Sequence, residues 1–311
     1  MSGIYLHIPF CKQACHYCDF HFSTSIRRKD EMLTALRKEL LMRKDEIREP
    51  VQTIYFGGGT PSLLNRGEIE ELLSCVYGNF LVVDRAEITL EANPDDLEPS
   101  RIEELARTRV NRLSLGIQSF REEDLRYMNR AHDSRQALDS MKAASDHFEN
   151  ISIDLIYGTP GLSREAWKEN LKIAFGFPIK HISSYALTVE PKTALDHFIR
   201  AGKSAAPDEN EARIHFEILM QESVKEGFVH YEVSNFAQKG YESQHNTSYW
   251  KGKPYLGIGP SAHSYSGSTR SWNTANNAKY LKAIGSNRLD REVERLSKID
   301  KINEMIMTSL R

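Results

Sequence analysis

Three cysteines near the start of the chain have a spacing that suits metal chemistry. Cys11, Cys15 and Cys18 follow the pattern C-x3-C-x2-C, whereas the fourth cysteine, Cys75, is far away in the sequence. Three thiolates can hold an iron–sulfur cubane and leave one iron open for a substrate or cofactor. A structural zinc ion needs four ligands, so one of three histidines would have to complete that alternative: His7, His16 or His21. The spacing favours an iron–sulfur cluster.

Six short apolar runs predict strands, and helical periodicity predicts helices between them. The runs begin at Ile4, Val51, Ala86, Val110, Ile151 and His181. The helical stretches are "DEMLTALRKELLMRKDEI" (30–47), "GEIEELLSCVY", "EPSRIEELAR" and "SREAWKENLKIAF", the last with Ser163 as its N-cap. Repeated β-then-α units predict right-handed crossovers and a parallel sheet. Because no GxGxxG fingerprint is present, we expect an α/β fold that forms an open or complete barrel.

Polar residues stand at the ends of these predicted strands. In β/α barrels, functional residues lie at the C-terminal ends of the strands. The cysteine loop follows the first strand and "GGGTP" (57–61) the second, while Glu91, Gln118 and Asp154 belong to the third, fourth and fifth. Three consecutive glycines allow close backbone approach to a ligand, although a tight turn would also explain them. We expect one site that contains all these groups.

The β/α alternation stops after about residue 205. "EARIHFEILMQESVKEG" predicts a helix that ends at Gly227, and "HYEVSNFA" (230–237) predicts a strand. A segment rich in glycine, aromatic residues and histidine follows. We therefore predict a barrel core over 1–205 and a smaller α+β extension over 206–311. Because "DKINEMIMTSLR" resembles a helix without a C-terminal cap, we expect the natural protein to continue further.

Composition narrows the class of protein. The formal net charge is −2, and no basic run suggests nucleic-acid binding. No stretch approaches the roughly 18 apolar residues of a membrane span, and the start does not resemble a signal peptide. Four unevenly spaced cysteines do not suggest a secreted disulfide framework. The expected compartment is the cytoplasm, and Cys75, beside Leu72 and Val76, is expected to pack in the core.

In its barrel context, the cysteine motif resembles that of the radical S-adenosylmethionine (radical SAM) enzymes. Flanking blocks resemble the coproporphyrinogen III oxidase-like subfamily: "YLHIPFCKQACHYCDF", "YFGGGTPSLL", "LEANPDDL", "SLGIQSF", "MNRAHDS" and "IDLIYGTPG". The resemblance runs from Tyr5 to about Tyr265. It implies a partial (β/α)6 TIM-like barrel of the radical SAM type.

The resemblance also implies cofactors and the residues that hold them. Cys11, Cys15 and Cys18 would hold a [4Fe-4S] cluster, and SAM would bind the open iron. In this family an electron donor reduces the cluster, which splits SAM to a 5′-deoxyadenosyl radical. The positions that match SAM contacts are Tyr5, Tyr17, Phe20, Gly58, Gly59, Thr60, Glu91, Gln118, Arg130 and Asp154. Simple packing would also explain the three aromatic residues, and a cap or salt bridge would explain Arg130.

The subfamily has two branches with different chemistry. The oxygen-independent oxidase removes carbon dioxide from porphyrinogen propionates, whereas the other branch consists of heme chaperones. The oxidase has a fourth cysteine where this chain has Phe20, and a long segment before its cysteines, which here begin at residue 11. Both differences favour the chaperone branch, which delivers heme to acceptor proteins such as membrane-associated respiratory enzymes.

A third feature, "HNTSYW" (245–250), matches a motif of the heme chaperones. There the histidine is a candidate heme ligand, which implies His245 here. Tyr249 and Trp250 would offer flat apolar surface to a porphyrin, and His263 is a second, weaker candidate. A true oxidase, a radical SAM methyltransferase acting on an aromatic or heterocyclic substrate, and a zinc protein remain as alternatives.

Overall fold

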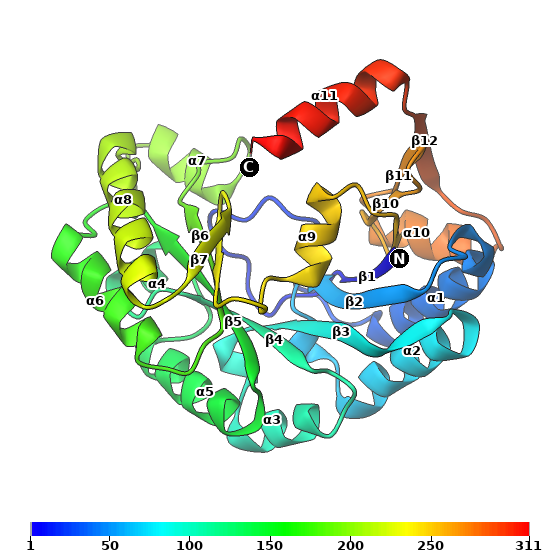
Figure 1. The fold of residues 1–311 in the computed structure, drawn as a ribbon, viewed down its shortest axis with the longest axis horizontal. Coiled ribbons are helices and arrows are strands. Elements are labelled where there is room, and N and C mark those ends of the chain that lie inside the picture. Colours follow the sequence, from blue (N-terminus) through cyan, green and yellow to red (C-terminus); the bar gives the residue numbers. More distant parts are fainter. Residues whose placement is uncertain (1, 311) are drawn as a thin grey trace.

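The computed structural model describes residues 2–310 (Figure 1). Within these residues, twelve strands form one continuous sheet. The sheet order is β12-β11-β10-β9-β1-β2-β3-β4-β5-β6-β8-β7. The central strands are β1 (Ser2–Ile8), β2 (Val51–Gly58), β3 (Val82–Ala92), β4 (Arg112–Gln118), β5 (Asn150–Tyr157) and β6 (His181–Ala186). They pair in parallel in chain order, which confirms the predicted parallel sheet.

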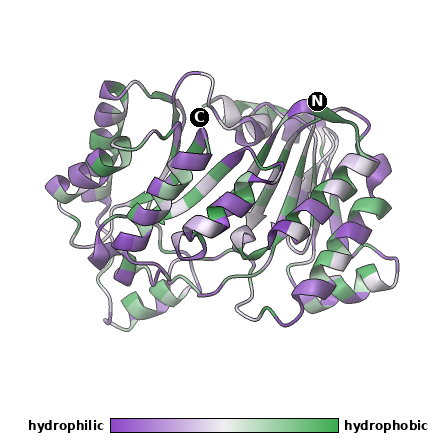
Figure 2. Cartoon of the chain, turned by 90° about the horizontal axis from the view of Figure 1, so that it is seen from below, coloured by the Kyte–Doolittle hydropathy of each residue, from purple (hydrophilic) through white to green (hydrophobic). Residues whose placement is uncertain are grey.

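Helices cover the outer face of the curved sheet (Figure 1). They are α1 (Lys29–Met42), α2 (Arg66–Asn79), α3 (Pro99–Ala106), α4 (Glu122–Tyr127), α5 (Ser134–His147) and α6 (Arg164–Phe175). Short 3-10 turns occupy Lys44–Glu46, Pro61–Leu63 and Pro94–Asp96. Figure 2 shows apolar strands at the centre, with helices that mix hydrophilic and hydrophobic residues along their length. Strands with both faces covered have nearly continuous apolar sequences, which is why the apolar runs in the sequence located them.

Several local predictions can be checked. Ser163 caps α6, because its hydroxyl accepts a hydrogen bond from the Ala166 amide. The predicted helix over 30–47 was too long, since α1 ends at Met42 and a 3-10 turn follows. Cys75 is half-buried on α2 and packs against the core, as predicted.

The C-terminal elements extend the same sheet at both edges. They are α7 (Ala194–Arg200), α8 (Glu209–Lys225), β7 (Val229–Glu232), β8 (Asn235–Ala237), α9 (Gln244–Trp250), β9 (Tyr255–Ile258), β10 (His263–Tyr265), β11 (Thr269–Asn273), α10 (Asn277–Gly285), β12 (Arg291–Arg295) and α11 (Lys298–Ser309). Gly227 has a φ of 77° just after α8, which confirms the predicted helix end. The single strand predicted over 230–237 was wrong: β7 and β8 form an antiparallel hairpin. The turn forms because the Glu232 carboxylate accepts hydrogen bonds from the Ser234 amide and the Asn235 side chain.

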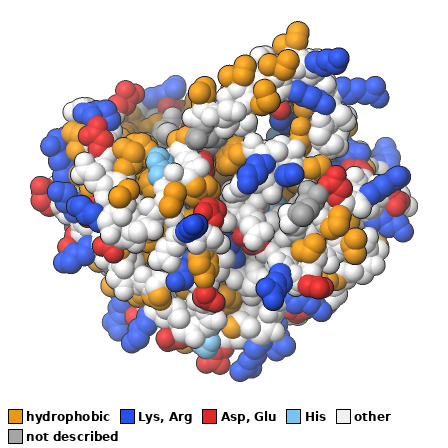
Figure 3. Space-filling view, viewed as in Figure 1, with side chains coloured by type: hydrophobic (Ala, Val, Ile, Leu, Met, Phe, Trp, Pro, Cys, Tyr) orange, Lys and Arg blue, Asp and Glu red, His pale blue; other side chains and the backbone are white. Residues whose placement is uncertain are grey.

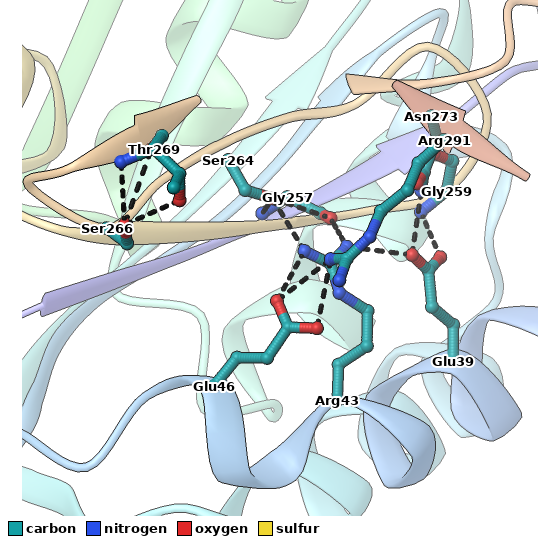
Figure 4. Close-up of polar contacts among 10 residues, drawn as sticks. All are labelled: Glu39, Arg43, Glu46, Gly257, Gly259, Ser264, Ser266, Thr269, Asn273 and Arg291. Atoms are coloured by element: carbon teal, nitrogen blue, oxygen red, sulfur yellow. Dashed lines mark hydrogen bonds and ion pairs between the residues drawn. The ribbon is translucent and has the colours of Figure 1, made fainter. Parts of the chain in front are cut away.

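A buried polar network joins α1 to the C-terminal strands (Figure 4). The Arg43 guanidinium donates to Glu39 (2.9 Å), to Ser264 Oγ (2.9 Å) and to the Gly257 carbonyl (2.7 Å). Glu39 also accepts hydrogen bonds from the Gly259 amide, the Asn273 side chain and the Tyr280 hydroxyl. These contacts fix β9 and β10 beside β1, where β9 pairs in parallel with Gly3–Leu6.

Helix α11 crosses above the open side of the barrel (Figure 1). None of its residues is buried, and large apolar side chains such as Ile299, Met305 and Met307 are more than half exposed. Figure 3 shows hydrophobic side chains gathered along this edge of the molecule. No helix within residues 2–310 is long and apolar enough to span a membrane.

Candidate functional site

The cysteine loop connects β1 to α1 and is fixed by backbone contacts. The Cys11 amide donates to the Ser23 carbonyl at 3.0 Å, and the His16 amide donates to the Met128 carbonyl at 3.0 Å. Lys12 forms ion pairs with Asp95 and Asp96 across the loop. The loop is therefore held between β3 and α4 in a defined conformation.

The three thiols of this loop are free and partly exposed within the described residues. Burial raises the pKa of Cys18 to about 11, and the neighbouring Cys15 and Cys11 raise it further. Burial also raises the pKa of Cys11, although a hydrogen bond from Thr60 opposes the shift. Three thiols that influence one another need nearby cations to become thiolates, and metal ions would supply that charge.

The three histidines of the zinc alternative have other partners. His7 is hydrogen-bonded to the Tyr5 hydroxyl and the His21 carbonyl, and His21 to Asn277. His16 Nδ1 is hydrogen-bonded to the Tyr127 carbonyl. Across residues 2–310, no three His, Cys, Asp or Glu side chains converge as a site for one metal ion. This arrangement gives the zinc alternative no support, whereas a cubane is larger than one ion.

The contacts of Arg130 show whether the residues around the three thiols fit an anionic iron–sulfur cluster that also binds a carboxylate. Its Nη1 donates to Cys15 Sγ at 3.2 Å, and its Nη2 donates to Asn93 Oδ1 at 2.6 Å and to the Gly116 carbonyl at 2.9 Å. Its Nε is buried without a hydrogen-bond partner, and in the described part of the chain no carboxylate forms an ion pair with it. A buried guanidinium without a counter-ion is costly. Its position beside the thiols fits a thiolate-bound cluster and the carboxylate of SAM.

Two carboxylates lie inside the barrel, on β3 and β5. Burial raises the pKa of Glu91 to about 7, and the nearby Asp154 raises it further. Tyr55 donates to Glu91 Oε1 at 2.8 Å and the Gly58 amide to Oε2 at 3.2 Å. Burial likewise raises the pKa of Asp154 to about 6, against a hydrogen bond from Ser183. These groups can accept an ammonium group or ribose hydroxyls, as the SAM assignment requires.

The backbone is strained at Gln118, the last residue of β4, which was predicted to contact SAM. Gln118 is buried and has a φ of 64°, a left-handed conformation that is unfavourable for residues other than glycine. A Cβ added to Gly116 would lie 3.1 Å from Gln118 Nε2 and 3.2 Å from Arg130 Nη2. Strained residues of this kind cluster at functional sites. The structure therefore brings Gln118 and Arg130 together.

The glycines at the end of β2 and directly after it are explained by protein contacts as well as by a ligand. Gly58 has a φ of 107°, and an added Cβ would lie 2.5 Å from the His7 ring. A Cβ on Gly59 would lie 2.5 Å from the Phe10 carbonyl oxygen. The Thr60 amide donates to that same carbonyl at 2.6 Å. These residues thus pack β2 tightly against β1 and the cysteine loop.

The three aromatic residues predicted near the cofactors have different environments. The Tyr5 ring stacks on Tyr55, with ring centroids 6.0 Å apart. Tyr17 packs beside a small apolar cluster, and Arg130 donates to its hydroxyl at 3.5 Å. Phe20 is 70% exposed. Only Phe20 has a large free surface to offer a ligand.

His245 is buried behind the site rather than facing it. Its Nδ1 is hydrogen-bonded to Thr53 Oγ1 at 2.7 Å and its Nε2 to the Tyr249 hydroxyl at 2.8 Å. Burial lowers its pKa to about 3. In this conformation both ring nitrogens are engaged, so iron ligation would require one of these hydrogen bonds to break.

A cavity of about 980 Å³ opens above these groups. Its lining includes seven residues that the sequence analysis named as SAM or heme contacts: Tyr5, Phe20, Gly58, Glu91, Tyr249, Trp250 and the weaker candidate His263. The lining also contains residues that sequence reasoning missed: Lys251, Tyr255, Tyr265, Arg270, Lys301, Met305 and Met307. The density of aromatic residues after residue 249 was a signal for the first few. Nothing in the sequence indicated that α11 lies across the cavity.

Comparisons with known proteins agree with this geometry. The family model "Radical SAM superfamily" matches residues 5–174. A heme chaperone, HemW, from Bacillus subtilis is 34% identical over 100% of this chain and 83% of its own length. HemW from Lactococcus lactis is 37% identical over 100% of this chain and 81% of its length. The solved coproporphyrinogen III oxidase (HemN) from Escherichia coli, a radical SAM enzyme, has a TM-score of 0.85 and 25% identity, with 99% of this chain and 75% of that chain covered.

Proposed function

Because the chain belongs to the radical SAM superfamily and within it to the HemW heme chaperone family, we propose that it binds a [4Fe-4S] cluster, SAM and heme, and delivers heme to acceptor proteins. One observation supports this function above the others. A cavity of about 980 Å³ joins Glu91 and Gly58, on the SAM side, to an aromatic wall formed by α9, β9 and β10. Pockets for organic ligands span roughly 300–1,000 Å³, so this cavity is large enough for a bulky cargo.

The residues of the barrel rim have distinct roles in this proposal. Cys11, Cys15 and Cys18 hold the cluster, which supplies an open iron for SAM and electron transfer to its sulfonium. Arg130, already within hydrogen-bond distance of Cys15, binds the SAM carboxylate and balances the charge of the thiolates. Glu91 and Asp154 accept the ammonium group and the ribose hydroxyls. Tyr5, Tyr17, Phe20, Gln118 and the backbone of residues 58–60 complete the pocket.

The "HNTSYW" motif contributes to heme binding mainly through its aromatic rings. Tyr249 and Trp250 line the cavity, and His245 holds the Tyr249 hydroxyl from behind. We further propose a cytoplasmic location, an external electron donor, and membrane-associated respiratory enzymes as heme acceptors. A true oxidase is the second candidate, because the HemN fold matches nearly the whole chain.

The cluster assignment is tested by metal analysis of protein reconstituted without oxygen. Cys15→Ala should lose iron and sulfide, because a cubane held by two thiolates is labile. Cys75→Ala is the matched control: this thiol is half-buried on α2, and it should leave iron and sulfide contents unchanged. Equal iron in both variants would contradict the assignment. Exposure of the wild type to air should destroy the cluster, because its open iron is accessible to oxygen.

The function itself is tested by two parallel reactions of the reconstituted protein. One contains coproporphyrinogen III, SAM and a reductant, and the other contains heme. We expect a heme Soret band that stays with the protein, transfer of heme to an apo-acceptor, and no decarboxylated porphyrin. A decarboxylated product would identify an oxidase, and a methylated product would identify a methyltransferase.

A further inference from the structure

The inside of the barrel contains a buried cation that the cofactor assignments leave without a role. Arg112 is the first residue of β4 and is 2% exposed. Within residues 2–310, its guanidinium forms no hydrogen bond and no ion pair, and its Nε is buried without a partner. A buried charge of this kind is costly unless its surroundings compensate it. The groups that face Arg112 must therefore balance its charge.

The strand register places Arg112 between acidic residues of the neighbouring strand β3. Arg112 pairs with Thr89, so Glu87 and Glu91 lie two residues to either side of its partner and share its face of the sheet. Neighbouring strands are roughly 4.8 Å apart and each residue rises about 3.3 Å, which puts the Cα atoms of Arg112 and either glutamate about 8 Å apart. A long arginine side chain can therefore act on carboxylates at both levels of the barrel.

Glu87 has other partners, which leaves two carboxyl groups that Arg112 can influence most. The Glu87 carboxylate accepts hydrogen bonds from two backbone amides at the start of α9, at 3.1 and 3.0 Å. Glu91 is one of the remaining carboxyls, and Asp154, on the next strand β5, faces the same side of the sheet as Arg112. Burial raises the pKa of both groups, and Arg112 opposes that rise at each of them.

The other titratable groups around these two carboxyls do not supply the same charge. The tyrosines are neutral because burial raises their pKa values, and the histidines are neutral because burial lowers theirs. These neutral groups are Tyr5 on β1, Tyr55 on β2, His181 and the partly exposed Tyr185 on β6, Tyr231 on β7, and His245 and Tyr249 on α9. Arg130 is a second cation that acts on Asp154, but it is hydrogen-bonded to Cys15 at the cysteine loop. Among the described residues, Arg112 is the cation that acts on both carboxyls.

Resting on the proposed function, we propose that Arg112 is a positioning residue of the SAM site: its guanidinium supplies the fixed positive charge that favours the ionised forms of Glu91 and Asp154 while the site is empty. The two carboxylates are then ready to receive SAM, which carries a sulfonium cation. Arginine suits this task because its guanidinium stays protonated in proteins. Arg112 acts through these two groups rather than on SAM itself.

The titration of Glu91 in the full chain without cofactors tests this charge directly. Its carboxyl signal in a carbon NMR spectrum is identified by its loss in Glu91→Gln, and its midpoint should lie near pH 7 in the wild type. Arg112→Gln should raise that midpoint by on the order of one pH unit, because a nearby positive charge is lost. Arg112→Lys keeps a positive charge and should stay close to the wild type. Arg109→Gln, whose side chain pairs with Glu70 at the partly exposed surface just before β4, is the matched control and should change nothing.

Equilibrium binding of SAM to the reconstituted protein gives a second readout. In the wild type, the affinity should rise with pH as Glu91 ionises, with a midpoint near pH 7. If Arg112→Gln moves this midpoint to about 8, the ionised fraction at pH 7 falls from about one half to about one tenth, and SAM should bind roughly fivefold more weakly. At pH 9 the two affinities should converge, whereas a structural defect would weaken binding equally at every pH.

The outcomes separate failure of this inference from failure of the proposed function. A wild-type titration of Glu91 in Arg112→Gln, or equal shifts in Arg112→Gln and Arg112→Lys, would overturn the role of Arg112. If Arg112→Gln does not fold, the comparison is made in the Asp154→Asn background, which has one buried carboxyl fewer to balance, and equal midpoints with and without Arg112→Gln would overturn the role there. Wild-type protein that binds no SAM would refute the proposed function, while the titration of Glu91 would still decide the role of Arg112.

Discussion

Glu91 and Asp154 are retained inside the barrel although burial disfavours their charged forms. The pKa of Glu91 is raised to about 7 and that of Asp154 to about 6, first by burial. The buried Arg112 lowers both pKa values in part. Each carboxyl group is thus close to its titration point near neutral pH. A cationic ligand such as the SAM ammonium would favour the ionised form. These carboxyl groups therefore favour ligand binding but do not stabilise the empty protein.

Glu91→Gln should therefore stabilise the empty protein at alkaline pH. The unfolded pKa is near 4.5 and the folded pKa near 7, so the folded protein binds the extra proton and its stability falls as pH rises through this window. The variant lacks this loss, and its advantage should grow from near zero at pH 4.5 to at most roughly 3 kcal/mol above pH 7. Thermal unfolding from pH 5 to pH 8 measures the difference.

The same variant should bind SAM more weakly, because it cannot present a carboxylate. Glu103→Gln, on the exposed face of α3, is the control and should show no pH-dependent difference from the wild type. A Glu91→Gln advantage that is equal at pH 5 and pH 8 would refute the raised pKa.

At the scale of elements, α1 and the C-terminal strands depend on one buried arginine. Arg43 contacts Glu39, Glu46, Ser264 and the Gly257 carbonyl (Figure 4). Removal of one partner from a buried ion pair leaves the other charge uncompensated. The network therefore determines how firmly β9 and β10 are attached to the barrel.

Arg43→Met should destabilise the protein by roughly 3–5 kcal/mol, because Glu39 would stay buried without its counter-ion. Arg28→Met, at the opposite end of the same helix, is the matched control. Both side chains of its pair with Glu31 are at least half exposed, so the removal of this pair should barely change the denaturant midpoint. Chemical denaturation measures both variants, and equal midpoints would mean that the network does not stabilise the fold.

Sequence patterns predicted the barrel elements better than the edges of the sheet. Runs such as Ile151–Tyr157 are apolar because both faces of the sheet are covered, and that signal is local. The pairing of β9 with β1 joins residues about 250 positions apart, and no local pattern encodes it. The β7–β8 hairpin was missed because its turn depends on the Glu232 side chain rather than on glycine or proline.

The residues of the candidate site also fall into those that the sequence predicted and those that it did not. The cysteines, Glu91 and Arg130 are recognisable because single motifs contain them. The engaged ring nitrogens of His245 and the position of α11 depend on residues that are distant in the sequence. They required the folded chain.

At the scale of the whole molecule, α11 is attached less firmly than any barrel helix. It buries no residue among those described, and the Arg270–Glu304 ion pair links it to β11. Local stability follows buried apolar contacts. We therefore regard α11 as the most easily opened helix of the fold.

Hydrogen exchange should reveal this difference. Amides of α11 should exchange near the rate of an unfolded peptide, while those of β1 and β2 should exchange only on global unfolding. Heme should slow exchange in α11, because the helix lines the cavity. Protection of α11 in the empty protein equal to that of β1 would contradict the loose attachment. No change on heme addition would contradict its role as a cover.

The place of β1 in the sheet has a consequence for synthesis on the ribosome. β1 emerges before β2 and β9. β2 can pair with one of its edges early, but its other edge waits for β9 (Tyr255–Ile258). At roughly 5–20 residues per second, the roughly 200 residues in between take about 10–40 s to translate. Throughout that time an apolar strand with Ile4, Leu6 and Ile8 has an open edge, which can template aggregation. Nascent chains that stall before residue 255 should therefore depend on folding assistance.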